Sequence, residues 1–115
     1  MVIGCELCED VWVAESPSIK HALAGATIIV NLSASDETVG KDSYRRSLVS
    51  MTSAKLLAGY IYTSAGEGES TQDIVFGAHN IIAENGIVLK ESTRFNNEII
   101  VSEIDVFRLK NERRK

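Results

Sequence analysis

Short apolar runs and helical patterns alternate along the first half of the chain. Residues 2–8, 27–32 and 58–64 are rich in apolar and β-branched side chains, and each run has the length of a buried strand. Between them, residues 18–24 and 43–57 place apolar positions at helical spacing. The pattern therefore predicts a strand–helix–strand–helix–strand arrangement, in which two βα units contribute to one sheet.

The ends of both helices carry local signals. Ser16 and Pro17 begin the first helix, because a serine side chain caps free amides and proline fits the first turn. Gly25 ends that helix, and a polar loop of residues 33–41 precedes the next one. The side of the second helix that faces the sheet is expected to consist of Leu48, Met51, Thr52, Lys55 and Leu56.

The second half of the chain has the pattern of antiparallel strands. Residues 74–83 and 87–92 flank Asn85-Gly86, a dipeptide that favours a two-residue hairpin turn. Residues 98–104 predict a last strand, after which Asp105 can cap a short final helix. We therefore expect an α/β fold with a mixed sheet and helices on at least one face. As a free monomer, such a chain would be one half of a layered sandwich.

Composition and charge narrow the function classes. The chain has 115 residues, 44% of them hydrophobic, and a net charge of −4, which fits one domain and argues against a nucleic-acid partner. No segment approaches the roughly 18 to 20 apolar residues of a membrane span, and no signal peptide is recognisable, so a cytoplasmic location is expected. The basic run Arg113-Arg114-Lys115 is interpreted as a solvated helix end. Because the first strand begins at residue 2, we expect a preceding part to be missing.

Two cysteines lie three positions apart along the first strand. This spacing turns them to opposite faces, which disfavours a shared disulfide or zinc ion. Cys5 shares its face with apolar neighbours and is expected to fill the core. Cys8 lies at the exit of the strand, where open α/β sheets place their chemistry, and is a candidate nucleophile. The adjacent Glu9 and Asp10 disfavour a thiolate, so Cys8 needs a cationic partner, which no lysine of the chain clearly supplies.

Three further features have structural as well as functional interpretations. Gly66-Glu67-Gly68 lacks the third glycine of a nucleotide loop and opens no helix, so a tight turn is favoured over a phosphate site. Arg45 and Arg46 begin a helix and oppose its dipole, which requires either an acidic partner or an anionic ligand. His21 and His79 lie in apolar settings and are interpreted as structural residues, so no metal site is expected.

Several blocks of the sequence match one family in order. The blocks are Gly4–Trp12, His21–Ala26, Asn31–Ser35, Tyr44–Arg46, Tyr62–Thr71 and Val75–His79. With them the chain closely resembles the glutaminase domain of glutamine-dependent NAD synthetases, a branch of the nitrilase superfamily of carbon–nitrogen hydrolases. The run from Cys8 to Trp12, Cys-Glu-Asp-x-Trp, is typical of that branch.

The resemblance implies a fold and a chemistry. The fold is a four-layer αββα sandwich, of which this chain would be one half, with helices on one face of a mixed sheet. The chemistry is glutamine hydrolysis by a Glu-Lys-Cys triad, in which Cys8 matches the nucleophile, forms a glutamyl thioester and releases ammonia. The amide of Glu9 would help to bind the oxyanion, and Ser33 and Ser35 lie on the loop that contacts the amino-acid end of the substrate.

The chain is expected to contain only part of the family domain. The glutamate base and the lysine belong to the amino-terminal half of the family domain. The synthetase domain, which would use ATP and magnesium to make NAD from deamido-NAD, is also absent from residues 1–115, so no cofactor is expected here.

Residues 1–115 are thus expected to form the carboxyl-terminal half of a glutaminase domain, inactive alone. Their expected partners are the missing half, the synthetase domain and further copies in a homo-oligomer. Two alternatives stay open: a non-catalytic half-domain that only associates through its sheet face, and a nitrilase-type amidase that acts on another amide.

Overall fold

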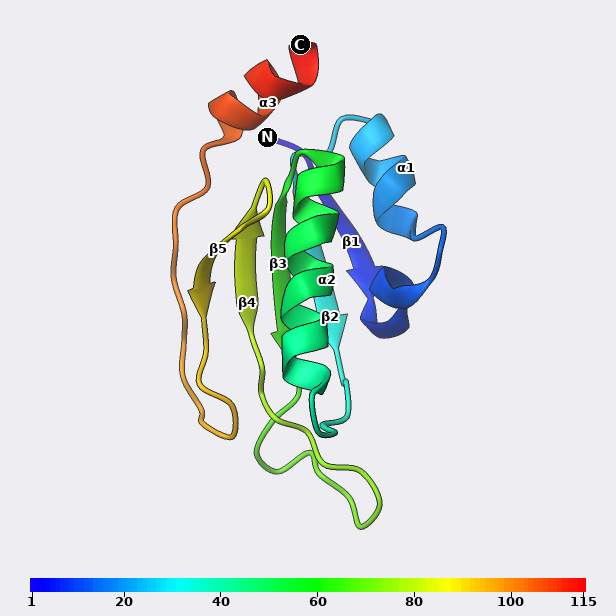
Figure 1. Cartoon of the computed structure of the whole chain (residues 1–115), viewed down its shortest axis with the longest axis vertical. Coiled ribbons are helices and arrows are strands. Elements are labelled where there is room, and N and C mark those ends of the chain that lie inside the picture. The colour runs from blue at the N-terminus through cyan, green and yellow to red at the C-terminus, as the bar shows by residue number, and fades with distance from the viewer.

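Five strands form one mixed sheet in the computed structural model, which describes residues 1–115 (Figure 1). The strand order follows the chain: β1 (Ile3–Leu7), β2 (Ile28–Ser33) and β3 (Gly59–Ser64) run parallel. β4 (Ile81–Glu84) pairs antiparallel with β3, and β5 (Ile87–Glu91) pairs antiparallel with β4. The predicted mixed sheet is confirmed.

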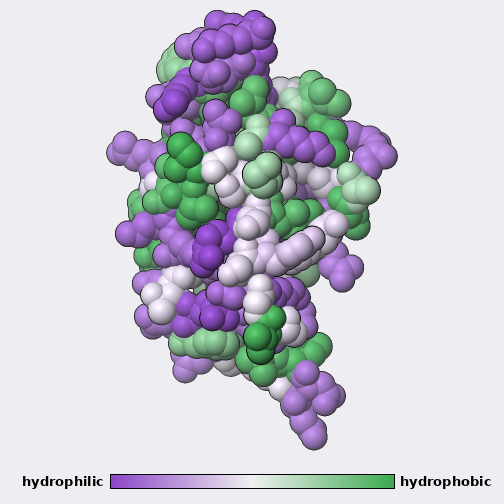
Figure 2. Space-filling model, in the orientation of Figure 1, coloured by the Kyte–Doolittle hydropathy of each residue, from purple (hydrophilic) through white to green (hydrophobic).

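Helices cover one face of this sheet. α1 (Pro17–Leu23) and α2 (Lys41–Leu56) lie on the same side, and α3 (Val106–Arg114) lies near the amino ends of the parallel strands (Figure 1). Figure 2 shows the helix-covered side as a mosaic of hydrophilic and hydrophobic areas, with a hydrophilic C-terminal helix at the top. No helix combines the length and the apolarity that crossing a membrane requires. The core between the sheet and the helices consists of Val11, Ala26, Ile29, Val49, Ala58, Tyr60, Tyr62, Ile81 and Ala83.

The opposite face of the sheet carries exposed apolar side chains. Ile3, Leu7 and Leu32 are 54%, 58% and 57% exposed there. Cys5 lies between Ile3 and Leu7 on the same face and is exposed as well. The expectation that Cys5 fills the core was therefore wrong, because alternation along β1 defines two faces without saying which one the helices cover.

The helix-covered side of β1 consists of Gly4 and Glu6, both buried. Gly4 permits the close approach of α1, since a Cβ at this position would lie 2.7 Å from Cβ of His21. The His21 ring in turn contacts the carbonyl of Cys5 through Nε2 at 2.9 Å. His21 thus joins α1 to β1, as expected for a structural residue.

α2 presents a more polar side to the sheet than its sequence predicts. Its buried residues are Arg45, Val49 and Ser53, whereas Met51 is 65% exposed. Leu48, Met51 and Leu56 also line a groove between α2 and the segment that follows β1. The predicted inner side is correct for Leu48 and Leu56, which pack against the core, and was wrong for Met51 and Lys55, which are exposed.

The hairpin between β4 and β5 is confirmed. Asn85 and Gly86 have φ angles of 44° and 87°, as a two-residue type I′ turn requires. The predicted strand of residues 74–83 is correct only at its end, because the earlier residues form a loop. That loop makes an isolated bridge between Asp36 and Phe76 instead of joining the sheet.

The predicted strand of residues 98–104 was wrong. This segment is extended but forms no ladder with the sheet, and it passes beside the open face, where Ile99 and Ile100 border Ile61. Gly59 provides room for it, since a Cβ there would lie 2.7 Å from Cδ1 of Ile104. Within this segment only Ile100 and Ile104 are half-buried, whereas Ile99 and Val101 are exposed, so its apolar residues do not mark a paired strand.

α3 is held at both ends. As predicted, Asp105 caps it, with Oδ1 accepting a hydrogen bond from the Arg108 amide at 2.9 Å. Near the other end, the guanidinium of Arg113 donates to the carbonyls of Ala26 and Leu56 at 2.6 and 3.0 Å. The expectation of a solvated basic helix end was wrong for Arg113, because this residue binds carbonyls at the ends of the other helices.

Candidate active site

Cys8 lies where β1 ends and a 3-10 helix, η1 (Cys8–Trp12), begins. Its φ angle of 46° falls in the left-handed region, which costs a non-glycine residue about 1 to 2 kcal/mol. The predicted strand over residues 2–8 thus ends at Leu7, and a sharp turn follows it. Such a conformation persists only where surrounding contacts hold it.

Asn31 on β2 supplies those contacts. Its Oδ1 accepts a hydrogen bond from the Cys8 amide at 3.0 Å, and its Nδ2 donates to the Cys8 carbonyl at 3.4 Å. The Ser33 hydroxyl also donates to Oδ1, at 2.6 Å. Asn31 is fully buried, so one side chain fixes both polar groups of the Cys8 backbone.

A buried tyrosine and a buried glutamate extend this contact across three strands. Asn31 Nδ2 donates to the Tyr60 hydroxyl at 3.0 Å, and Tyr60 donates to Oε1 of Glu6 at 2.5 Å. Burial, followed by the hydrogen bond to Glu6, raises the pKa of Tyr60 well above its usual value. Tyr60 therefore stays protonated and remains a donor.

The carboxylate of Glu6 also caps α1. Its Oε2 accepts a hydrogen bond from the Ser18 amide at 2.9 Å, and a negative charge is favourable at a helix N-terminus. Ser16 occupies the cap position as predicted, but its hydroxyl contacts Oγ of Ser18 at 2.8 Å and makes no capping hydrogen bond. The expected side-chain cap was wrong, because a residue from β1 takes its place.

A cavity of about 320 Å³ lies against the cysteine. Lys41 Nζ forms an ion pair with Oδ1 of Asp36 at 2.5 Å and lies 5.6 Å from the ring centre of Trp12. The hydrogen bond from Lys41 lowers the pKa of Asp36, so this carboxylate stays ionised. The cavity therefore combines a thiol with one lysine and two acidic residues, Glu9 and Asp36. The lining residues are Cys8, Glu9, Trp12, Ala34, Ser35, Asp36 and Lys41.

Arg45 holds the loop of residues 33–41 in place from inside the molecule. It is fully buried, forms an ion pair with Glu37 at 2.6 Å, and donates to Oγ of Ser35 at 3.3 Å. Its neighbour Arg46 pairs with Glu91 at 2.5 Å. The acidic partners expected for these two arginines are therefore present.

The predicted substrate-contacting serines occupy different surroundings. Ser35 lines the cavity beside Cys8, whereas the hydroxyl of Ser33 is committed to Asn31 and does not line it. Glu9 borders the same cavity and lies in the first turn of η1, where backbone amides have no partner within the helix. The structure thus brings Cys8, Glu9 and Ser35 together and leaves Ser33 in the supporting layer.

His79 lies below this loop rather than in the cavity. It is fully buried, with Nδ1 at 2.8 Å from Nη1 of Arg45 and Nε2 at 3.6 Å from Glu91. Burial and the charge of Arg45 lower the pKa of His79, which therefore stays neutral. No group of three or more histidine, cysteine or acidic side chains is arranged to hold a metal ion.

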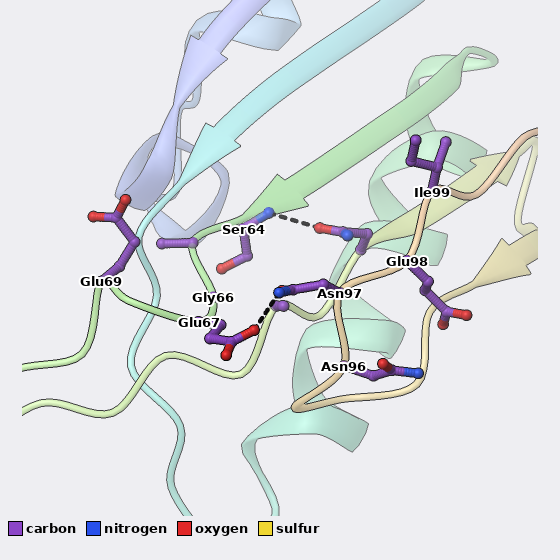
Figure 3. A pocket seen from close by; sticks show the side chains of 11 residues that line it. Ser64, Gly66, Glu67, Glu69, Asn96, Asn97, Glu98 and Ile99 are labelled. Atoms are coloured by element: carbon purple, nitrogen blue, oxygen red, sulfur yellow. Dashed lines mark hydrogen bonds between the residues drawn. The ribbon is translucent and has the colours of Figure 1, made fainter.

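A second cavity, of about 420 Å³, lies beside the end of β3 (Figure 3). Figure 3 shows Glu67 hydrogen-bonded to Asn97 at its rim. The Glu69 amide donates to the carbonyl of Gly66 at 3.1 Å, so the predicted tight turn is confirmed. With three glutamates among its lining residues and no thiol, this cavity lacks the nucleophile found in the first one.

Sequence reasoning identified the cysteine and missed the residues around it. Glu6 carries a signal that could have been used, because a carboxylate inside an apolar strand requires buried partners. Lys41 gives a weaker signal, as the cation of a polar loop at the exit of β2. Asn31 and Tyr60 lie 29 positions apart and meet only through the sheet register, so no local pattern marks them.

Comparisons with known proteins agree with this geometry. The sequence model of the carbon–nitrogen hydrolase family matches residues 1–114. The chain is similar to the glutamine-dependent NAD(+) synthetase of Mycobacterium tuberculosis, with 45% identity over 114 residues. This match covers 97% of the chain and 17% of that protein, so the chain spans about a sixth of the length of the curated relatives it matches.

Solved structures of related proteins contain a part with the same fold as this chain. A glutamine-dependent NAD(+) synthetase from Cytophaga hutchinsonii superposes with a TM-score of 0.67 at 29% identity, covering 80% of this chain and 14% of that one. Nit3 of Saccharomyces cerevisiae, a member of branch 10 of the nitrilase superfamily, gives a TM-score of 0.82 over 97% of this chain and 40% of that one. At 20% identity, the likeness to Nit3 concerns the fold alone.

Proposed function

Because the chain belongs to the carbon–nitrogen hydrolase family, we propose that Cys8 is the nucleophile of a glutamine amidohydrolase. The observation that carries the proposal is the position of Cys8, held at a positive φ at the exit of β1 and bordering a cavity that contains Lys41 and Asp36. The similarity to NAD synthetases supports glutamine as the amide. Residues 1–115 would then be part of a hydrolase domain that supplies ammonia for ATP-dependent NAD synthesis from deamido-NAD.

The proposed reaction proceeds through a thioester. The sulfur of Cys8 attacks the side-chain amide carbon of glutamine, and the amide nitrogen leaves as ammonia once it has gained a proton. Water then attacks the thioester carbon, which releases glutamate and restores the thiol. The Glu9 amide would stabilise the negative oxygen of each tetrahedral intermediate, together with a lysine from outside residues 1–115. A glutamate base, also from outside, would accept the thiol proton.

The charges of the cavity suit the other end of glutamine. The ammonium of Lys41 can bind the α-carboxylate, and the carboxylate of Asp36 can bind the α-ammonium, because the two lie on the same wall. Ser35 adds a hydroxyl, and the Trp12 ring provides an apolar surface for the methylene groups. This arrangement favours an amino-acid amide over a simple aliphatic amide. Equal kcat/KM for glutamine and propionamide would support the alternative of a general amidase.

The test is ammonia release by the intact protein. Cys8→Ala is expected to abolish ammonia release from glutamine, because no other thiol borders the cavity. Cys5→Ala is the matched control, since Cys5 lies on the opposite face of the sheet and does not border the cavity, so the rate should stay unchanged. Ammonia release that persists in Cys8→Ala would contradict the proposal.

Residues 1–115 alone are proposed to be inactive, because the glutamate base and the oxyanion lysine lie elsewhere. Measurable glutamine turnover by the purified chain would contradict this statement. The open sheet face exposes Ile3, Leu7 and Leu32. This apolar surface favours association with the other half of the domain or with further copies of this chain. It also supports the second candidate, a half-domain that associates without catalysis. A protease-resistant, monodisperse monomer in sedimentation velocity would count against association through this face.

A further inference from the structure

Three buried polar side chains, one from each parallel strand, form a single hydrogen-bonded chain that ends at Cys8. Glu6 on β1, Asn31 on β2 and Tyr60 on β3 are 2%, 0% and 0% exposed. Tyr60 donates to Glu6 at 2.5 Å, Asn31 donates to Tyr60 at 3.0 Å, and Asn31 binds both the amide and the carbonyl of Cys8. Because hydrogen bonds are directional, these links fix the orientation of the side chains, which apolar contacts would not do.

The direction of every hydrogen bond in the chain is fixed. A carboxylate accepts only, and Glu6 receives one bond from Tyr60 and one from the Ser18 amide. The proton of Tyr60 is therefore used by Glu6, which leaves its oxygen to accept from Nδ2 of Asn31. With Nδ2 on that side, Oδ1 of Asn31 must face the Cys8 amide. Glu6, two links away, thus favours the same orientation of the Asn31 amide that the Cys8 amide and carbonyl require.

We propose that Glu6, Tyr60 and Asn31 are positioning residues that hold Cys8 in its left-handed conformation and thereby orient the thiol for attack. The inference rests on the proposed function of Cys8 as a nucleophile. Reactions of this type depend steeply on the placement of the attacking atom. Glu6 adds a second constraint, because the same carboxylate anchors the start of α1 beside the turn.

Tyr60→Phe tests the proposal in the intact protein. The substitution keeps the ring in the core but removes the hydroxyl that links Asn31 to Glu6. We expect kcat for glutamine to fall on the order of 10- to 100-fold, because Asn31 loses one of the hydrogen bonds that hold its amide and therefore places Cys8 less firmly. KM should stay within about threefold, since no residue of the cavity wall changes.

Tyr62→Phe is the matched control. Tyr62 is the ladder partner of Asn31, is 1% exposed, and has a buried hydroxyl without a hydrogen-bond partner. Removing that hydroxyl leaves the hydrogen bonds between Glu6, Tyr60, Asn31 and Cys8 intact, so kcat and KM should equal those of the wild type. Equal kcat values in Tyr60→Phe and Tyr62→Phe would overturn the proposal.

Glu6→Gln provides a second variant of unchanged volume. If its amide nitrogen faces the Ser18 amide, two hydrogen-bond donors meet. If it faces Tyr60, the direction of the hydrogen bonds from residue 6 to Asn31 is reversed, which turns Asn31 away from the Cys8 amide. We expect the same loss in kcat at an unchanged KM. If Tyr60→Phe fails to fold, a wild-type kcat in Glu6→Gln overturns the proposal on its own.

Amide hydrogen exchange separates this inference from the proposed function. The Cys8 amide donates to Asn31, so its protection should fall at least about tenfold in Tyr60→Phe and stay unchanged in Tyr62→Phe. This readout does not depend on glutamine. If the wild type releases no ammonia but the Cys8 amide responds as stated, the proposed function fails and the positioning chain stands. Unchanged protection of that amide in Tyr60→Phe overturns the positioning chain.

Discussion

Replacing Arg113 by methionine should loosen α3 specifically. The guanidinium of Arg113 lies where the C-terminal ends of α1 and α2 meet, a place where positive charge is favourable. It donates to the carbonyls of Ala26, Leu56 and Leu57 at 2.6, 3.0 and 3.0 Å, and a fourth contact, to Ala22, is at the 3.5 Å limit. Besides these bonds, α3 buries only Leu109.

The size of the effect follows from these contacts. Three short hydrogen bonds at about 1 kcal/mol each give about 3 kcal/mol, because the freed carbonyls can be rehydrated at this half-buried place. Methionine regains part of the ordering entropy of the arginine side chain, which reduces the loss by about 1 kcal/mol. The local opening free energy of α3 should therefore fall by about 2 kcal/mol, which corresponds to roughly 30-fold faster amide exchange.

Hydrogen exchange of the intact protein measures this loss directly. Exchange of the amides of residues 106–114 should accelerate in Arg113→Met, while that of β2 and β3 stays unchanged. Arg114→Met is the control, since Arg114 is exposed on the same turn and should leave all amides unaffected. The reasoning is refuted if Arg113→Met and Arg114→Met exchange at the same rate in α3.

Two further predictions concern ionisable residues near the site. Lys41→Met should raise KM for glutamine about 10- to 100-fold with a smaller change in kcat, because Lys41 is proposed to bind the α-carboxylate; steady-state kinetics would contradict this role if KM were unchanged. His79 has a lowered pKa in the folded protein, so the unfolded chain binds its proton more readily and stability is lost as the pH falls below about 6.5. Between about pH 7.5 and 5.5, the Tm of His79→Gln should therefore fall less with decreasing pH than the Tm of the wild type. Equal slopes of Tm against pH would show that His79 does not cause the loss of stability.

Much of the fold could be predicted because it is encoded locally. The three parallel strands are apolar runs bounded by turn signals, and Asn85-Gly86 has the positive φ angles of its hairpin turn. What failed depends on contacts between distant segments. Alternation along β1 could not show that Cys5 faces the open side, and the basic run could not show that Arg113 reaches carbonyls 56 to 91 positions away.

The residues of the candidate site likewise fall into those that a local sequence pattern predicts and those that it does not. Cys8 was found because it lies at the end of an apolar run, at the expected exit of a strand, which is a local pattern. The cavity residue Lys41 and the positioning residue Asn31 were missed, because their relation to Cys8 arises only when β2 pairs with β1. A glutamate inside the first apolar run was the one local sign of a buried polar chain.

The central claim, that Cys8 is the reactive thiol of a glutamine site, is tested most directly by covalent labelling. The intact protein is treated with a glutamine-mimicking diazoketone, with and without excess glutamine, and the modified residue is located by peptide mass spectrometry. We predict one label, on Cys8 and suppressed by glutamine, while Cys5, which does not border the cavity, stays unmodified. Labelling of Cys5, or labelling of Cys8 that glutamine does not suppress, would contradict the account.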